Sequence, residues 1–287
     1  MTDIGRRAFL AGMATTPLLL DPLHGQAALE ALASGATPAR QAAASDGRKL
    51  FQVYGSGMFV QDGVAVIDVE GVLIHRLGFE GSLWGMATGY DGIARQIRAA
   101  RADPSVKAIW LDIDSPGGFT AGCFALAEEI AKGAKSEGGK PVWAFINEMA
   151  CSAAYALASV CDKVFAPEDA VLGSIGVYCD HLDLTEMLAN DGVKLTRFRS
   201  GTKKGRGGPT EPLDDDTAAK LQAWVDVGRQ RFAKLVGMGR RMSVASVLAT
   251  EGDWYSTAQA IELGLCDGAM SELDAWAKLQ RSLKRAA

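Results

Sequence analysis

The chain has 287 residues, of which 48% are hydrophobic and 22% are charged, with 30 Lys and Arg against 34 Asp and Glu. This length and composition fit one large globular domain or two small ones, and they exclude an intrinsically disordered chain. The slight acidic excess also excludes a dedicated nucleic-acid binder, which would carry a strongly basic surface.

The cysteines and histidines restrict the chemistry further. The five cysteines are odd in number and none forms a Cys-x-x-Cys pair, which argues against a disulfide framework or a zinc ribbon. We expect reduced, buried thiols, no cofactor and no metal. Asp112 and Asp114 lie on the same side of a predicted strand, but capping of the strand end explains them better than metal binding.

The first 50 residues are predicted to be an N-terminal arm followed by a flexible linker. Arg6-Arg7 and the uncharged run up to Leu20 imitate a twin-arginine export signal, but Asp21 closes the run early. The interpretation we favour is that residues 17–32 form this N-terminal arm, which docks on a neighbouring surface. Residues 33–48, rich in Ala, Ser, Gly and Pro, are predicted to be the linker.

Strands and helices alternate through the main domain, predicted over residues 51–275. The predicted strands are Val64–Val69 with an extension over Gly71–Ile74, Val106–Ile113, Val142–Ile146, Lys163–Ala166, Val171–Val177 and Lys194–Arg199. The predicted helices are Tyr90–Ala102 with Asp91 as its N-cap, Thr120–Lys132, Ser152–Ser159, Leu184–Asn190 and Pro212–Met238. Residues 276–287 are expected to be a C-terminal tail. The alternation predicts an α/β layered fold with a mostly parallel sheet and functional groups beyond the carboxyl ends of its strands.

Three segments suggest chemistry. They are Asp114–Gly118, predicted as a turn, Ala150–Tyr155 at a strand-to-helix junction, and the glycine- and lysine-containing loop Arg199–Pro209. Each alone has a structural explanation: Gly117 and Gly118 would let a helix approach a strand, and the small residues around Ser152 would suit a close helix crossing.

Together and in this order, the segments resemble the S49 peptidase family of signal-peptide-peptidase A type, whose members use a serine and a lysine. The resemblance runs from about Gly63 to Asp267. It is carried by Ile113–Gly118, Ala150–Tyr155, Leu172–Val177, Ser200–Lys204 and Tyr255–Asp267. It implies a layered fold like those of ClpP and crotonase.

The resemblance also implies roles for individual residues. Ser152 would be the nucleophile and Lys204, 52 residues later, its general base, with Lys203 as the neighbouring candidate. Ser174 would orient the lysine amine. The backbone N–H groups of Gly118 and Ala153 would form the oxyanion hole.

This chemistry places a demand on the lysine. A serine hydroxyl needs a base to remove its proton, and lysine serves only when its amine is neutral. Because the ordinary pKa of lysine is about 10.4, keeping the amine neutral near pH 7 costs about 4.6 kcal/mol, most of which burial must supply. Backbone donors then stabilise the oxyanion, and losing one typically costs about 3 kcal/mol.

Three alternatives stay open. A ClpP-type triad would use His181, although a polar residue near the start of the helix Leu184–Asn190 explains that side chain better. A crotonase-type enzyme would bind coenzyme A thioesters, and the pairing of Ser152 with Lys204 argues against it. In the third alternative, the protein is a non-catalytic capsid assembly module with the same fold.

Within the family, the leader Pro17–Pro22 followed by an Ala-rich segment resembles phage prohead proteases similar to the C protein of lambda. We therefore expect a phage or prophage capsid maturation protease that cleaves scaffold, portal or its own chain, with residues 33–48 as the self-cleavage region. A cellular signal-peptide-peptidase-like protease is the alternative. We expect a homo-oligomer in the host cytoplasm inside the assembling prohead, with no nucleic-acid or membrane partner. Export through the twin-arginine-like segment is the alternative location.

Overall fold

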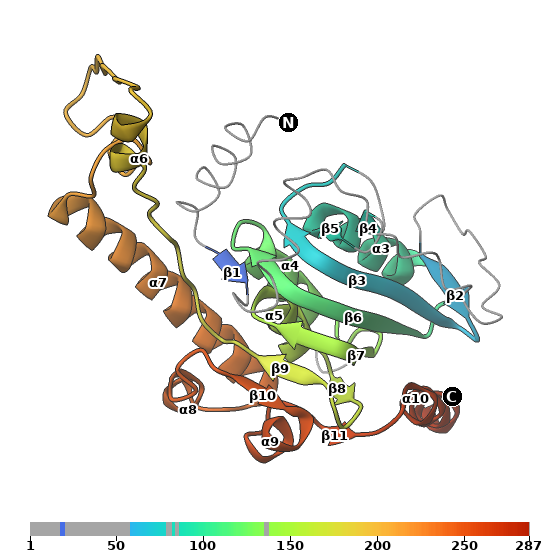
Figure 1. Ribbon diagram of the computed structural model, residues 1–287. Helices are drawn as coiled ribbons and strands as arrows, with labels where there is room; N and C mark the ends of the chain where they lie inside the picture. Colours follow the sequence, from blue (N-terminus) through green and yellow to red (C-terminus); the bar gives the residue numbers. More distant parts are fainter. Residues whose placement is uncertain (1–17, 21–57, 79–81, 84–85, 135–137, 287) are drawn as a thin grey trace.

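A mostly parallel β-sheet forms the centre of the chain in the computed structural model, which describes residues 18–20, 58–78, 82–83, 86–134 and 138–286 (Figure 1). The strands are β1 (Leu18–Leu20), β2 (Phe59–Gln61), β3 (Val64–Ile74), β4 (Ser82–Leu83), β5 (Ala87–Gly89), β6 (Ala108–Phe119), β7 (Val142–Cys151), β8 (Lys163–Ala166), β9 (Val171–Gly173), β10 (Trp254–Ser256) and β11 (Gly268–Ala269). The helices are α3 (Tyr90–Ala102), α4 (Cys123–Lys132), α5 (Ala153–Ser159), α6 (Thr185–Asn190), α7 (Asp215–Arg240), α8 (Val244–Leu248), α9 (Thr257–Glu262) and α10 (Glu272–Ala286).

The long strands β3, β6 and β7 lie side by side and run parallel. The main path through the sheet is β10-β9-β7-β6-β3-β5-β4, and β1 pairs with β6, β2 with β3, and β8 with β7 and β11. The central strands are apolar on both faces, which is typical of a parallel sheet covered on both sides. The expected α/β class is therefore confirmed.

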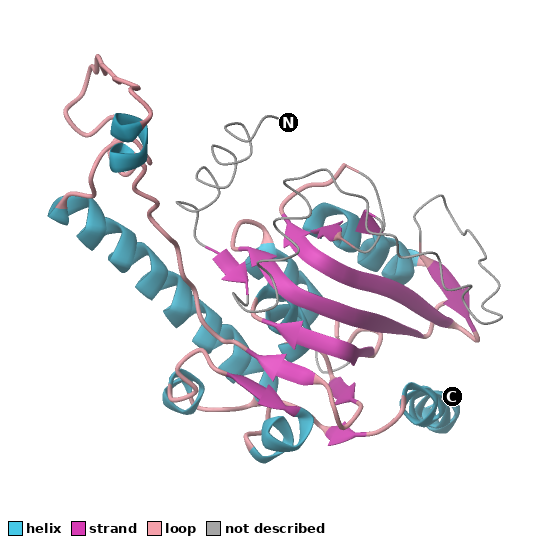
Figure 2. Cartoon of the chain, in the orientation of Figure 1, coloured by secondary structure: helices cyan, strands magenta, loops and turns pink. Residues whose placement is uncertain are grey.

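Helices cover both faces of this sheet (Figure 2). Helices α3, α4, α5 and the C-terminal half of α7 pack over one face around a large buried core. Helix α10 covers part of the other face, where Trp110 stacks on Phe145 with ring centroids 5.6 Å apart and meets the edge of Trp276 at 5.3 Å. The boundary expected between the main domain and the C-terminal tail, after residue 275, falls inside α10. Ala275 and Leu279 of this helix are buried in this second core.

Residues 182–213, here called the arm, project away from the sheet together with the N-terminal half of α7 (Figure 1). Every residue from 189 to 206 is exposed. Helix α7 returns the chain to the body, where its residues Phe232, Leu235 and Val236 are buried. The arm therefore rests on the body mainly through its base.

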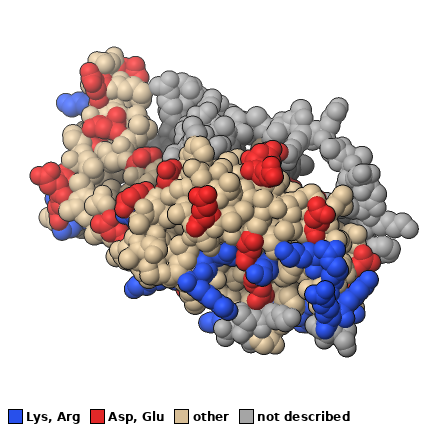
Figure 3. Space-filling view, turned by 90° about the horizontal axis from the view of Figure 1, so that it is seen from below, with Lys and Arg blue, Asp and Glu red and all other residues tan. Residues whose placement is uncertain are grey.

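Charge is spread unevenly over the surface despite the small net charge of −4. Seen from below, Lys and Arg gather on the side away from the arm, and Asp and Glu are more frequent toward the arm (Figure 3). A groove on the α10 face is lined by Lys163, Lys278, Arg281 and Arg285 together with Asp274.

Several predicted elements are confirmed and others are wrong. The helix Tyr90–Ala102 and the strand Lys163–Ala166 have the predicted bounds. Asp91 is not the N-cap, because Gly89 holds that place and the Asp91 carboxylate accepts the N–H of Leu77 at 3.0 Å.

Two further corrections concern extended segments. Asp114–Gly118 is not a turn but the continuation of β6, paired with β3 on one edge. Lys194–Arg199 forms no strand and runs exposed along the arm.

The N-terminal expectations lie largely outside the described residues. This holds for the twin-arginine-like segment and for the linker over residues 33–48, while Leu18–Leu20 forms β1. Among the helices in the described residues, none combines the length and the apolar character needed to cross a membrane.

Candidate active site

The predicted nucleophile occupies the joint between a strand and a helix. Strand β7 ends at Cys151 and α5 begins at Ala153, so Ser152 makes the turn with φ 53° and ψ −116°. This backbone conformation is strained for a residue with a side chain, and such strain is concentrated at functional sites. The Ser152 N–H donates to the Gly173 carbonyl at 2.8 Å, and its carbonyl accepts the Ala156 N–H at 2.9 Å, which fixes the turn. The residue is 1% exposed.

A second strained serine lies beside the first. Ser174 follows Gly173, the residue that holds the Ser152 N–H, and has φ 53° with 6% exposure. Its own N–H donates to the Asp253 carbonyl at 2.8 Å. The end of β9 thus places Ser174 next to the Ser152 turn.

Gly118 lies near the end of β6, the neighbour of β7, and its backbone is crowded. A Cβ atom at this position would lie 1.9 Å from the Leu73 carbonyl oxygen of β3, so only glycine fits. The expectation that Gly117 and Gly118 admit a helix is therefore wrong for Gly118, because its close neighbour is the backbone of a strand.

Sequence reasoning missed two residues that shape this strand. Ser115 is fully buried, and its hydroxyl donates to the Gly71 carbonyl at 2.6 Å while accepting the Gly117 N–H at 3.1 Å. The Tyr90 hydroxyl donates to the Phe119 carbonyl at 2.8 Å. The only signal for Ser115 is its place in a Ser-Pro-Gly-Gly stretch, where serine commonly binds nearby backbone, and nothing in the sequence marks Tyr90.

Two other reactive side chains around the Ser152 turn stay protonated. Burial raises the pKa of the Cys123 thiol to about 12, and this thiol contacts the Ala153 carbonyl at 3.7 Å. Burial also raises the pKa of the Tyr155 hydroxyl, which donates to the Leu265 carbonyl at 2.8 Å. A thiol attacks only as thiolate, so Cys123 is a poor nucleophile. As expected, the free cysteines are mostly buried, with Cys179 half-buried.

The structure places Ser174 beside Ser152 and Ala153, and Gly118 follows the part of β6 that pairs with the end of β7, but Lys204 is not brought to this junction. Lys204 lies in the exposed loop of the arm, where its N–H donates to the Gly201 carbonyl at 3.0 Å. Lys203 is exposed in the same loop and its amine pairs with the Asp216 carboxylate at 2.7 Å. Within one chain, both candidate bases are carried away from Ser152 by the arm (Figure 1).

His181, the alternative base, lies at the base of the arm. Its Nε2 is 3.3 Å from the Gly208 carbonyl oxygen. The nearby Asp183 carboxylate accepts the hydroxyl and the N–H of Thr185 at 2.6 and 2.9 Å, and these hydrogen bonds lower the pKa of Asp183. The Asp183 carboxylate therefore bonds Thr185, the first residue of α6, whose N-cap is Leu184.

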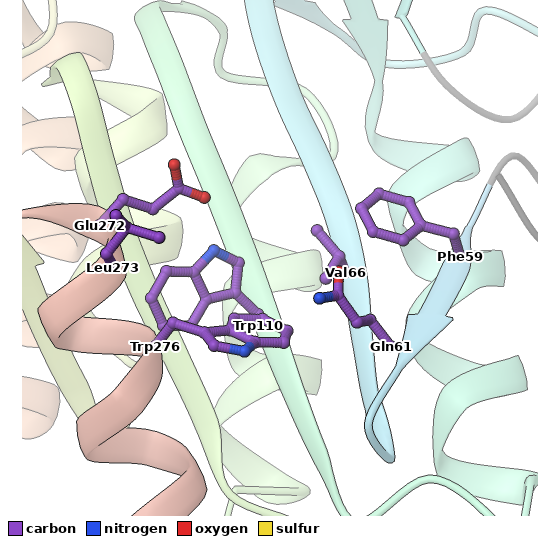
Figure 4. A pocket seen from close by; sticks show the side chains of 7 residues that line it. All are labelled: Phe59, Gln61, Val66, Trp110, Glu272, Leu273 and Trp276. Carbon is purple, nitrogen blue, oxygen red and sulfur yellow. The ribbon is translucent and has the colours of Figure 1, made fainter. Parts of the chain in front are cut away.

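Other possible sites lie apart from this junction. The Asp112 carboxylate accepts the side-chain amide of Asn147, and the described part of the chain holds no group of three His, Cys, Asp or Glu arranged for a metal ion. Figure 4 shows a pocket of about 200 Å³ on the α10 face, lined by the two indoles of Trp110 and Trp276. Its polar side chains include Gln61 and Glu272, and no serine, cysteine or lysine is among the residues that line it.

Comparison with known proteins gives a family match and several relatives. The model of peptidase family S49 matches residues 134–286. The head-tail preconnector protein GP5 of Enterobacteria phage P21 is 40% identical over 216 residues, or 75% of this chain and 42% of that protein. The capsid assembly protease C of Escherichia phage lambda is also 40% identical over 216 residues, covering 75% of this chain and 48% of the relative.

Cellular proteins match as well. A putative signal peptide peptidase SppA of Enterococcus faecium is 30% identical over 196 residues, or 68% of this chain and 56% of that protein. The chain thus spans less than half the length of the two phage relatives and little more than half of this one.

Proposed function

Since the chain belongs to peptidase family S49, we propose that it is a serine endopeptidase of phage head assembly, with Ser152 as nucleophile. The observation that supports the proposal is the strained turn at Ser152, whose N–H donates to the carbonyl of Gly173, the residue before Ser174. The name of the lambda relative, a capsid assembly protease, supports scaffold, portal or the chain itself as substrate.

In the proposed reaction, each of these residues has its own role. The Ser152 hydroxyl attacks the scissile carbonyl, and a neutral lysine amine takes its proton and returns it to the leaving amine. The N–H groups of Ala153 and Gly118 stabilise the oxyanion that forms on the carbonyl oxygen. In deacylation, the neutral lysine amine takes a proton from water as the water attacks the acyl carbonyl, and it returns that proton to the Ser152 oxygen as the ester bond breaks.

Lys204 needs a second surface to act as this base. A lysine serves as a general base only where burial favours its neutral amine, and residues 189–206 are all exposed in the single chain. The arm also exposes large apolar side chains, with Phe198 93% and Leu195 54% accessible, which is typical of an interaction site. We infer that the arm docks on another copy of the chain and brings Lys204 to the Ser152 of that copy.

The first experiment measures cleavage of co-expressed scaffold protein by single variants. Ser152→Ala and Lys204→Ala should each lower the rate by at least about a thousandfold, because nucleophile and base act as a unit. Lys203→Ala is the matched control, one residue away, and should keep the wild-type rate. Full activity of Ser152→Ala would refute the serine mechanism, and loss in His181→Ala with activity kept in Lys204→Ala would favour a histidine triad.

The second experiment tests whether the dyad forms between copies. An equal mixture of Ser152→Ala and Lys204→Ala chains should recover about a quarter of the wild-type rate, since half of the sites carry the serine and half of the docked arms carry the lysine. A mixture of Ser152→Ala with Ser174→Ala should recover nothing, because both changes lie at the same site. No recovery in the first mixture would show that the base is not shared between copies.

A non-catalytic role makes the opposite prediction. In that case, a fluorophosphonate probe would fail to label Ser152 in the folded, assembled protein, and none of the variants above would change processing of the scaffold.

A further inference from the structure

The N-terminal segment of the chain pairs with the strand that carries Gly118. Strand β1 runs antiparallel to the end of β6, with Leu18 opposite Phe119, Leu19 opposite Gly118 and Leu20 opposite Gly117. The partner strand belongs to the site described above, although β1 lies almost 100 residues earlier in the sequence.

The edge of β6 that β1 occupies is the one next to Ser152. Strand β3 takes the other edge, with Val72 and Leu73 opposite Gly117 and Gly118. Strand β7 accompanies β6 only as far as the pair Ser115–Ala150 and then turns away at Ser152. Strand β1 therefore continues the sheet in the place that β7 leaves, at the Ser152 turn (Figure 1).

This place is suited to an extended peptide. A strand edge binds a peptide through its backbone, and the pairing needs no particular side chains. Gly117 and Gly118 present no side chains to a peptide on this edge. A cavity of about 310 Å³ begins at Thr120, just beyond the paired strand, and is lined by Phe124, Trp224 and Arg231.

We propose that Leu18–Leu20 are a built-in occupant of the Gly117–Phe119 edge of β6, beside Ser152. The segment holds the position of a substrate, runs antiparallel to β6, and indicates extended protein segments as the class that binds there. The proposal rests on the proposed function, because it takes Ser152 as the nucleophile that such a peptide meets.

The occupant also regulates the site. A tethered segment acts at an effective concentration in the millimolar range, so a free peptide of similar sequence competes poorly. The site accepts substrate only after β1 leaves the edge, either by dissociation or by cleavage of the N-terminal segment.

A reversible disulfide tests the pairing. In a Ser152→Ala background, Leu18→Cys is combined with Phe119→Cys, since directly opposed antiparallel residues lie within disulfide distance. The probe is a fluorescein-labelled peptide with the sequence of residues 15–23, and its binding is measured by fluorescence anisotropy. Oxidation should weaken binding at least tenfold, and reduction should restore it.

The matched control is Leu20→Cys with Phe119→Cys, which lies two positions out of register. This pair should form little disulfide, and its peptide binding should not respond to oxidation. Equal cross-linking of the two pairs, or equal peptide binding in the oxidised and reduced states of the first pair, would overturn the proposal.

A second variant does not depend on a cross-link. Leu18→Pro with Leu20→Pro removes two backbone N–H groups from β1 and should tighten peptide binding at least tenfold, while Ala43→Pro in the predicted linker should not. Unchanged binding in the double variant would also overturn the proposal. Because every binding measurement uses Ser152→Ala, it stays informative even if cleavage assays refute the serine mechanism.

Discussion

At the scale of single residues, the site is defined by backbone conformations that few residues tolerate. Ser152 and Ser174 both have φ 53°, and each such conformation costs about 1–3 kcal/mol. The resemblance to the S49 family predicted both serines as site residues, but the sequence could not predict their strained backbone conformations. Strain depends on the surrounding hydrogen bonds, such as those from Ser152 and Ser174 to the Gly173 and Asp253 carbonyls.

Gly118 offers a direct test of the crowding between β3 and β6. Gly118→Ala should lower the free energy of unfolding by at least about 2 kcal/mol, because its Cβ would clash with the Leu73 carbonyl. Gly176→Ala is the control, since its Cβ would meet only the Gly252 Cα at 3.5 Å. Urea denaturation measures both, and similar values for the two variants would contradict the packing described here.

At the scale of elements, the strand predictions succeeded where the structure of a segment does not depend on the strands that pair with it. The apolar runs of β3 and β7 identify buried strands regardless of partners, so they were predictable. Asp114–Gly118 contains Pro and Gly, which are typical of turns, yet pairing with β3 and β1 keeps it extended. Residues 194–199 show the reverse case, because their sequence favours a strand but no strand within the described part of the chain pairs with them.

Helix α7 is anchored at one end only. Phe232 is fully buried, and its ring meets the edge of Phe124 with centroids 6.1 Å apart. Phe232→Ala should therefore lower the free energy of unfolding by about 3–5 kcal/mol. Phe198→Ala on the arm, where the ring is 93% exposed, should change it by less than about 0.5 kcal/mol. Thermal unfolding followed by circular dichroism compares the two, and a large loss in Phe198→Ala would show that the arm packs on its own body.

At the scale of the whole molecule, one carboxylate joins distant parts of the chain. Asp267 accepts hydrogen bonds from Arg240 at the end of α7, from Lys163 at the start of β8, and from the Val164 N–H, at 2.8–2.9 Å. Burial alone would raise the pKa of Asp267, but the hydrogen bond and charge of Arg240 and the hydrogen bonds from Lys163 and the Val164 N–H outweigh it, and the pKa is lowered.

This lowered pKa makes stability depend on pH in a defined direction. The contribution of Asp267 is complete above the pKa of an unfolded aspartate, about 3.9, and is lost as pH falls through the lower folded pKa. Asp267→Asn should cost about 3 kcal/mol at pH 7 and flatten the loss of stability below about pH 4. Asp216→Asn, whose carboxylate pairs with Lys203 on the surface, is the control and should behave as wild type. If the stability of Asp267→Asn fell below about pH 4 as steeply as that of the wild type, the pH dependence could not be assigned to Asp267.

The arrangement of the whole chain was the least predictable level. The family resemblance predicts that Ser152 and Lys204 act together, but motif order carries no information on whether one copy of the chain supplies both groups. The strand β1 was equally hidden, because Leu18–Leu20 is too short to show an alternating pattern and its partner is remote in the sequence.

The exposure of the tryptophans gives the protein internal optical reporters. Trp110 is 1% exposed in the core beneath α10, whereas Trp224 on α7 is 55% exposed. The emission of a solvated indole shifts to shorter wavelength when another surface covers it, and that of a buried indole shifts to longer wavelength when the core melts. A difference spectrum against Trp224→Phe would therefore follow the proposed docking of the arm separately from melting, in the same unlabelled sample.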